Sequence, residues 1–176
     1  MKKLKKYLLY SALPILVLAI IFFSAGIIFP IISYESKVTV KKPVEQSFRV
    51  FTDVFTFSEW IPRFITIKWL SGKQNEIGSK WEMTIEQEGK EYRMTETLIA
   101  FKENELFAFK LENDMLTNDV EIRFANKGET SEIISSNHIT GKNIFWKSLF
   151  VFSPSYFKQQ SKEMYDTLKK VIEKSN

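Results

Sequence analysis

Residues 79–101 read SKWEMTIEQEGKEYRMTETLIAF, and this stretch decides the fold. In its first half, Trp81, Met83 and Ile85 occupy every second position between charged or polar residues. Alternation with a period of two is typical of a β-strand with one covered face. Glu88-Gly89-Lys90 is a turn signal, and alternation resumes after it. The stretch therefore predicts an antiparallel β-hairpin.

Similar alternation on both sides extends the hairpin into a sheet. The pattern predicts strands over residues 37–40, 64–70, 79–87, 91–101, 106–111, 119–125 and 132–140. Their short connections, such as Asn126-Lys127-Gly128, are hairpin turns, so the sheet should be antiparallel with one covered face. Between the first two strands, Pro43 precedes a short helix over residues 44–52, and residues 55–62 form a short helix or loop.

The C-terminal segment predicts one long helix that begins at Ser153-Pro154 and ends at Lys174. One face of this helix is apolar at helical spacing and carries Phe157, Ser161, Met164, Leu168 and Val171. The helix is the natural cover for the open face of the sheet. The expected fold class is therefore α+β.

The N-terminal part has a different character. Residues 1–6 form a basic tail with four lysines, and residues 7–32 contain no charge. A helix of that length reaches roughly 39 Å, which exceeds the ~30 Å hydrocarbon core of a bilayer. The sequence therefore predicts a transmembrane helix over residues 7–32 and a folded domain over residues 33–176. The lysine excess before the helix predicts a single-pass protein with a cytoplasmic N-terminus and an extracytoplasmic domain.

A cleaved signal peptide is the alternative interpretation of this segment. Ser24-Ala25-Gly26 offers small residues for a peptidase, and the protein would then be secreted. Against cleavage, the apolar run continues from Ile27 to Ile32.

Composition excludes several classes of function. The chain has no cysteine, so disulfide scaffolds and thiolate sites are excluded, and its single histidine cannot build a His-rich zinc site. Four of the 25 lysines and arginines precede residue 33. Residues 33–176 therefore contain 21 basic and 21 acidic residues and carry no net charge. A nucleic-acid partner is not expected for a domain without net positive charge. The sequence indicates no cofactor and identifies no protein partner.

The order of elements resembles the START-like, or SRPBCC, superfamily, which includes polyketide cyclase/dehydrase and lipid-transport proteins. The resemblance spans Glu35 to Glu173 and is carried by Pro43-Val44-Glu45, residues 57–62, the six-strand meander, the turn at Gly128 and the closing helix. It implies a helix-grip fold, in which a curved antiparallel sheet of about six to seven strands surrounds the long helix and an apolar cavity. It also implies a hydrophobic small molecule or lipid as ligand.

The inward faces of the predicted strands and helix supply the candidate cavity residues. These are Trp81, Met83, Ile85, Tyr92, Met94, Glu96, Leu98, Phe107, Phe109, Phe124, His138 and Met164. Aromatic and aliphatic walls suit an apolar ligand, but the same residues would also suit a filled core.

Three features have both a functional and a structural interpretation. Glu96 shares a face with apolar residues, where a carboxylate anchors a ligand, acts as an acid or base, or forms a salt bridge. His138 is expected to be structural or at the surface, because no orienting partner is visible and the inward face of its strand is undetermined. The aromatic residues 145–152 suit a cavity lip, a second bilayer contact or packing under the sheet.

Three hypotheses follow from the sequence. The favoured one is a membrane-anchored domain that binds a hydrophobic small molecule or lipid without catalysis. The others are a cyclase or dehydratase of the same fold, and an interaction module of a membrane complex.

Overall fold

The computed structural model describes residues 2–87 and 89–175, and it describes side chains from residue 12 onward. Met1, Asn176 and Glu88, which belongs to the predicted hairpin turn, lie outside these residues. The described elements are, in order, α1 (Lys2–Ile28), β1 (Ile31–Val40), α2 (Val44–Thr52), the 3-10 helix η1 (Val54–Thr56), α3 (Phe57–Trp60), β2 (Phe64–Ser71), β3 (Lys80–Gln87), β4 (Lys90–Lys102), β5 (Leu106–Glu112), β6 (Leu116–Asn126), β7 (Ser131–Gly141), α4 (Ile144–Val151) and α5 (Pro154–Lys174).

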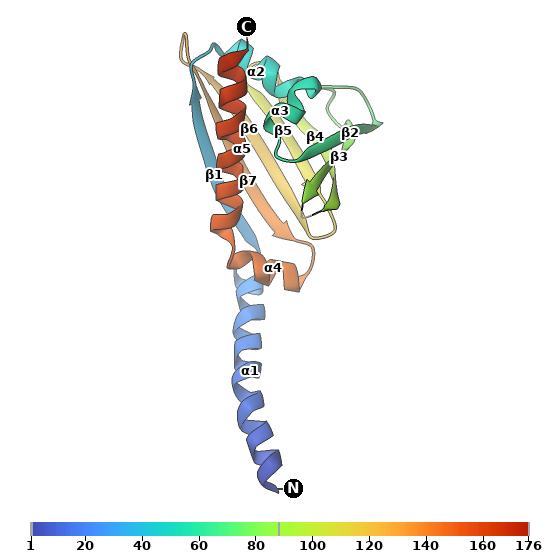
Figure 1. Cartoon of the computed structure of the whole chain (residues 1–176), viewed down its shortest axis with the longest axis vertical. Helices are drawn as coiled ribbons and strands as arrows, with labels where there is room; N and C mark the ends of the chain where they lie inside the picture. Colours follow the sequence, from blue (N-terminus) through green and yellow to red (C-terminus); the bar gives the residue numbers. More distant parts are fainter. Residues whose placement is uncertain (1, 88, 176) are drawn as a thin grey trace.

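The seven strands form one antiparallel sheet in the order β1-β7-β6-β5-β4-β3-β2. Each strand from β2 to β6 pairs with the next one in the chain, and β1 forms the edge beside β7. Helix α5 lies along one face of the sheet over β1 and β7. On the same face, α2 lies beside the C-terminal end of α5, and α3 lies toward β2 (Figure 1). The predicted helix-grip α+β fold is confirmed.

One irregularity in β4 changes which residues face inward. The pairing with β5 shifts between Leu98 and Ala100, so Ile99 forms a bulge. Because a bulge inserts one residue, the alternation reverses after it. Phe101, rather than Ala100, then packs against Phe48 of α2, with ring centroids 5.6 Å apart.

The junction between α1 and β1 differs from the sequence prediction. The predicted helical segment 7–32 ends at Ile28, and β1 begins at Ile31. Pro30 has no N–H group to continue a helix, and the next residues pair with β7 from Ile31 opposite Thr140. The lysines of the predicted tail lie in α1 itself, which begins at Lys2.

In the part of the chain that the structure describes, no helix combines the length and the apolar character needed to cross a membrane. The structure therefore does not support the transmembrane helix predicted from the sequence. The described side chains of α1 nevertheless leave many large apolar groups exposed, among them Ile15, Leu18 and Ile27.

Helix α4 packs against both α1 and the end of the sheet. Ser148 of α4 lies so close to Gly26 of α1 that a Cβ at Gly26 would come within 2.6 Å of the Ser148 backbone nitrogen. Phe22 of α1 stacks on Phe152, with ring centroids 6.0 Å apart. Phe150 is buried, whereas Phe145 and Phe152 are exposed, so the aromatic residues 145–152 are only partly packed into the domain.

The filled hydrophobic core occupies one end of the interior. It lies where α2 and the C-terminal half of α5 meet the sheet, around Phe48, Ile122, Leu168 and Ile172. Phe124 belongs to this core and contacts Phe48, with ring centroids 5.0 Å apart. The other end of the interior, beside the N-terminal half of α5, is hollow.

Candidate ligand cavity

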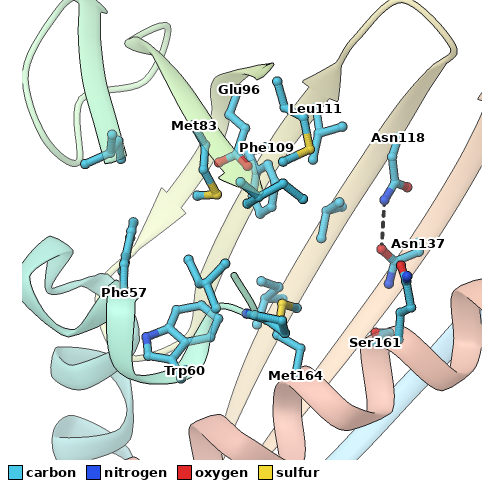
Figure 2. A pocket seen from close by; sticks show the side chains of 18 of the residues that line it. Phe57, Trp60, Met83, Glu96, Phe109, Leu111, Asn118, Asn137, Ser161 and Met164 are labelled. Atoms are coloured by element: carbon cyan, nitrogen blue, oxygen red, sulfur yellow. Dashed lines mark hydrogen bonds between the residues drawn. The ribbon is translucent and has the colours of Figure 1, made fainter. Parts of the chain in front are cut away.

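A cavity of about 470 Å³ lies between the sheet, α3 and α5. The inner faces of the strands line it from one side, and residues 157–165 of α5 line it from the other. Figure 2 shows α3 contributing Phe57 and Trp60, and α5 contributing Ser161 and Met164. The volume lies in the range of small-molecule sites in proteins.

The walls are largely apolar, with aromatic, aliphatic and thioether side chains. Trp60 packs edge-on to Phe57, with ring centroids 5.6 Å apart, which fixes the wall that α3 provides. Met83, Met94 and Met164 come from β3, β4 and α5. Methionine is flexible and polarizable, so these side chains can adapt to ligands of different shape.

Glu96 is the buried acidic group of the cavity, and 6% of the residue is exposed. Trp81 Nε1 donates a hydrogen bond of 2.7 Å to its Oε2 atom. Burial raises the pKa of Glu96 to about 7, and the Trp81 hydrogen bond opposes this rise. At neutral pH the carboxyl group is therefore present in both its protonated and ionised forms.

An amide pair forms a second polar region of the cavity wall. Asn118 Nδ2 of β6 donates to Asn137 Oδ1 of β7 over 2.9 Å (Figure 2). Asn137 Nδ2 in turn donates to Ser135 Oγ over 3.0 Å. Asn118 Oδ1 accepts from the backbone N–H of His138 over 3.1 Å. Each amide nitrogen uses one N–H in these bonds, so each has a second N–H to offer.

Two tyrosines complete the polar part of the interior. The hydroxyl of Tyr165 shares a hydrogen bond with Ser135, and that of Tyr34 shares one with Ser161. Burial raises the pKa of Tyr34 to about 12, against the effect of its hydrogen bond to Ser161. Burial likewise raises the pKa of Tyr165 above its usual range. Both phenols are therefore neutral at physiological pH.

Eight of the twelve residues predicted from the sequence line this cavity: Trp81, Met83, Ile85, Met94, Glu96, Phe107, Phe109 and Met164. Four predicted residues lie elsewhere. Tyr92 is half-buried beside the hairpin, Leu98 is buried outside the cavity, and Phe124 belongs to the filled core.

His138, the fourth residue, also lies outside the cavity, at the surface position that the sequence analysis expected for it. Its side chain is exposed on the outer face of β7, where Nδ1 lies 2.8 Å from Ser33 Oγ. Val120 pairs with Asn137 and Ile122 pairs with Ser135, and paired residues of antiparallel strands share a face. Because Val120 and Ile122 face inward, Asn137 faces inward and His138 faces outward.

The sequence prediction missed several lining residues, chiefly Tyr34, Asn118, Asn137, Ser161 and Tyr165. The pattern of β7 alone offered no signal for Asn137, because its inward face depends on the register of β7 against β6. Tyr34 offered none, since it fell next to the expected transmembrane segment. Among the described residues, no group of three or more His, Asp or Glu side chains could hold a metal ion.

A seven-stranded antiparallel sheet that grips a long helix around such a cavity defines the SRPBCC type of ligand-binding fold. Residues 32–173 match the family described as polyketide cyclase/dehydrase and lipid transport, and the chain belongs to this family.

Solved structures share the fold at low sequence identity. Ara h 8.0201 is 17% identical with a TM-score of 0.66, over 81% of this chain and 97% of its own. A protein from Chromobacterium violaceum is 14% identical with a TM-score of 0.65, over 82% and 99%. The Zhui aromatase/cyclase from Streptomyces sp. R1128 is 11% identical with a TM-score of 0.60, over 80% and 96%. A search of curated proteins finds no match.

Proposed function

We propose that this protein binds one hydrophobic small molecule or lipid in the cavity between the sheet and α5, beside a membrane. The observation that carries the proposal is the 470 Å³ cavity, because a domain of this size normally fills its interior. Burying about 200 Å² of apolar ligand surface there would contribute roughly 5 kcal/mol to binding. The polar side chains Glu96, Asn118 and Asn137 would orient the ligand.

Native mass spectrometry of the full chain tests this proposal. We expect the protein to leave the detergent micelles as a 1:1 complex with an added neutral apolar molecule such as 1-naphthylmethanol. Replacing Met94 and Met164 with Trp adds two indole rings to the cavity and should abolish the complex. The matched control replaces Ile99 and Lys170 with Trp, because these residues are exposed on the same two elements. Equal binding by both double variants would contradict a ligand site in the cavity.

Membrane attachment through α1 is part of the same proposal. Residues 7–32 carry no charge, four lysines precede them, and the described part of α1 exposes large apolar side chains. Phe145 of α4 and Phe152, which follows α4, lie beside α1 and are exposed, so they would extend the apolar surface to the bilayer interface. If α1 attaches the protein to a membrane, the full chain should fractionate with membranes and resist extraction by alkaline carbonate. Recovery of the protein in the carbonate extract would contradict attachment.

The lysine asymmetry supports a cytoplasmic N-terminus and an extracytoplasmic domain. Protease added to intact cells or spheroplasts should then degrade residues 33–176, whereas an N-terminal tag should be protected. The opposite pattern of protection would reverse the orientation. Release of a shortened chain that begins near Gly26 would instead support cleavage of a signal peptide.

An enzyme of the same fold is the second candidate, and Glu96 favours it. A buried carboxyl group whose pKa is raised to about 7 can both donate and accept a proton near neutral pH. Such a group would serve a cyclase or dehydratase as acid and base. Turnover of a candidate substrate that Glu96→Gln abolishes, with the fold intact, would support this function; unchanged turnover would exclude Glu96 from it.

A further inference from the structure

Glu96 differs from every other charged residue that lines the cavity. The remaining charged residues of the lining are Arg63, Glu86 and Glu163, and all three are exposed at the rim. Among the described residues, the lining contains no lysine and no histidine. The only charge deep in the cavity is therefore a carboxyl group, and acidic residues also prevail at the rim.

We propose that the ligand is an apolar molecule with a basic nitrogen, and that its cationic amino group binds to the carboxylate of Glu96. This inference rests on the proposed function, since it names the chemical class of the molecule in the same cavity.

The geometry of Glu96 leaves one acceptor for the ligand. Trp81 Nε1 occupies Oε2, and Trp81 is the only described residue with a hydrogen bond to this carboxyl group. Figure 2 shows the carboxyl group between the side chains of Met83 and Phe109, on the cavity side of the sheet. An ammonium group at Oε1 would also lie near the aromatic ring of Phe109, and aromatic rings attract cations at their faces.

The charge distribution discriminates between ligand classes. A carboxylate or phosphate ligand would meet Glu96 without a buried cation to bind it, because Arg63 is exposed. A neutral ligand would leave the ionised form of Glu96 without a counter-charge in an apolar site. A cationic nitrogen supplies that counter-charge and, with Trp81, satisfies both carboxyl oxygens.

The same arrangement makes binding depend on pH. The titratable groups that share the cavity with Glu96 are Tyr34, Tyr165, Glu86, Glu163 and Arg63. Both tyrosines stay neutral at physiological pH, so Glu96 is the buried group whose charge changes. Because the cation binds to the ionised form, its affinity should fall about tenfold from pH 8 to pH 6.

The experiment compares three probes of matched shape with the full chain in lipid nanodiscs. The probes are 1-naphthylmethylamine, 1-naphthylmethanol and 1-naphthoate, titrated by calorimetry with empty nanodiscs as the blank. At pH 8 we expect the amine to bind at least tenfold more tightly than the alcohol, and the carboxylate to bind most weakly. An alcohol or carboxylate that binds as tightly as the amine would overturn the inference.

Glu96→Gln keeps the size of the side chain and removes its charge. It should abolish both the preference for the amine over the alcohol and the pH dependence of amine binding. Glu121→Gln is the matched control, because Glu121 lies on the outer face of β6 and pairs with Arg123. An amine preference that survives Glu96→Gln would contradict the inference.

The outcomes separate the two proposals. If Glu96→Gln does not fold, the amine affinity of the unchanged protein at pH 6 and pH 8 decides, and equal affinities would contradict the inference. Equal binding of amine and alcohol would overturn the amine assignment but support the cavity as a binding site. Binding of none of the three probes would overturn the proposed function and the inference with it.

Discussion

At the scale of single residues, the raised pKa of Glu96 should make the stability of the fold depend on pH. The folded-state value of about 7 exceeds the ordinary 4.5, so between these values the folded state binds more protons than the unfolded state. The unfolding free energy should therefore fall as pH rises from about 4.5 to about 7, by at most about 3 kcal/mol.

Glu96→Gln should lack this contribution. Between pH 5 and pH 8 the unfolding temperature of the unchanged protein should fall by about 5–10 °C relative to Glu96→Gln. Thermal unfolding followed by circular dichroism measures the difference, with Glu121→Gln as a variant that should follow the unchanged protein. Parallel profiles for the unchanged protein and Glu96→Gln would show that Glu96 titrates normally.

His138 leads to the opposite expectation. Its side chain is exposed and bonds only to Ser33 among the described residues, so His138→Ala should change stability by less than about 0.5 kcal/mol. Apolar-probe affinity should also stay within twofold of the unchanged value, as titration of both proteins would show. A large loss of affinity would mean that His138 reaches the ligand.

These two residues show how far the sequence could predict the site. Glu96 was predictable, because it stands at an alternate position among apolar residues of one strand. The inward face of β7 required the register with β6, which only the pairing of Val120 with Asn137 reveals. Phe124 was predicted on the correct face, but face alone does not distinguish cavity wall from filled core. That distinction depends on α2, whose Phe48 occupies the space beside Phe124.

At the scale of elements, α5 divides the interior into two parts. Its C-terminal half buries Leu168 completely in the filled core, whereas its N-terminal half lines the cavity. Leu168→Ala should therefore destabilise the fold by about 2–5 kcal/mol, because it leaves a void in close-packed surroundings. Denaturant unfolding measures this loss, and Lys170→Ala on the exposed face should change stability by less than about 0.5 kcal/mol. A small effect of Leu168→Ala would show that this end is loosely packed.

The contact between α1 and α4 depends on a glycine. A side chain at Gly26 would meet the backbone of Ser148, so Gly26→Val should separate the two helices. The chain has no cysteine, so Phe22→Cys and Phe152→Cys can be introduced to measure cross-linking by a short bifunctional reagent. We expect efficient cross-linking in the double-cysteine protein that keeps Gly26, and a several-fold loss when Gly26→Val is added. The control Ile27→Val should cause no loss, because Ile27 is exposed. Unchanged cross-linking in Gly26→Val would contradict the packing of α4 on α1.

The elements themselves were largely predictable from local pattern. The helices Val44–Thr52 and Pro154–Lys174 match the predicted ranges, because Pro43 and Pro154 mark their starts and their apolar faces are regular. The boundary of α1 was missed, because composition does not reveal that Ile31 and Ile32 pair with β7. The bulge at Ile99 was missed for the same reason, since it depends on pairing with β5.

At the scale of the whole molecule, the apolar surfaces have two separate locations. One is the cavity beneath α5, and the other is the exposed side of α1 with Phe145 of α4 and the following Phe152, at the opposite end from the C-terminus (Figure 1). This layout agrees with a domain that holds an apolar molecule while its N-terminal helix contacts a bilayer. The filled core lies between these apolar surfaces and the C-terminal end of α5. It stabilises the fold around the cavity.

The most direct test of the cavity is the NMR spectrum of the methionine methyl groups. Met83, Met94 and Met164 line the cavity, whereas Met115 lies outside its lining. Addition of 1-naphthylmethanol to the ¹³C-methyl-labelled full chain should shift the signals of these three methionines, through ring currents of the bound probe, and leave Met115 in place. Binding that shifts Met115 alone, or that leaves all three cavity methionines unchanged, would contradict a ligand site between the sheet and α5.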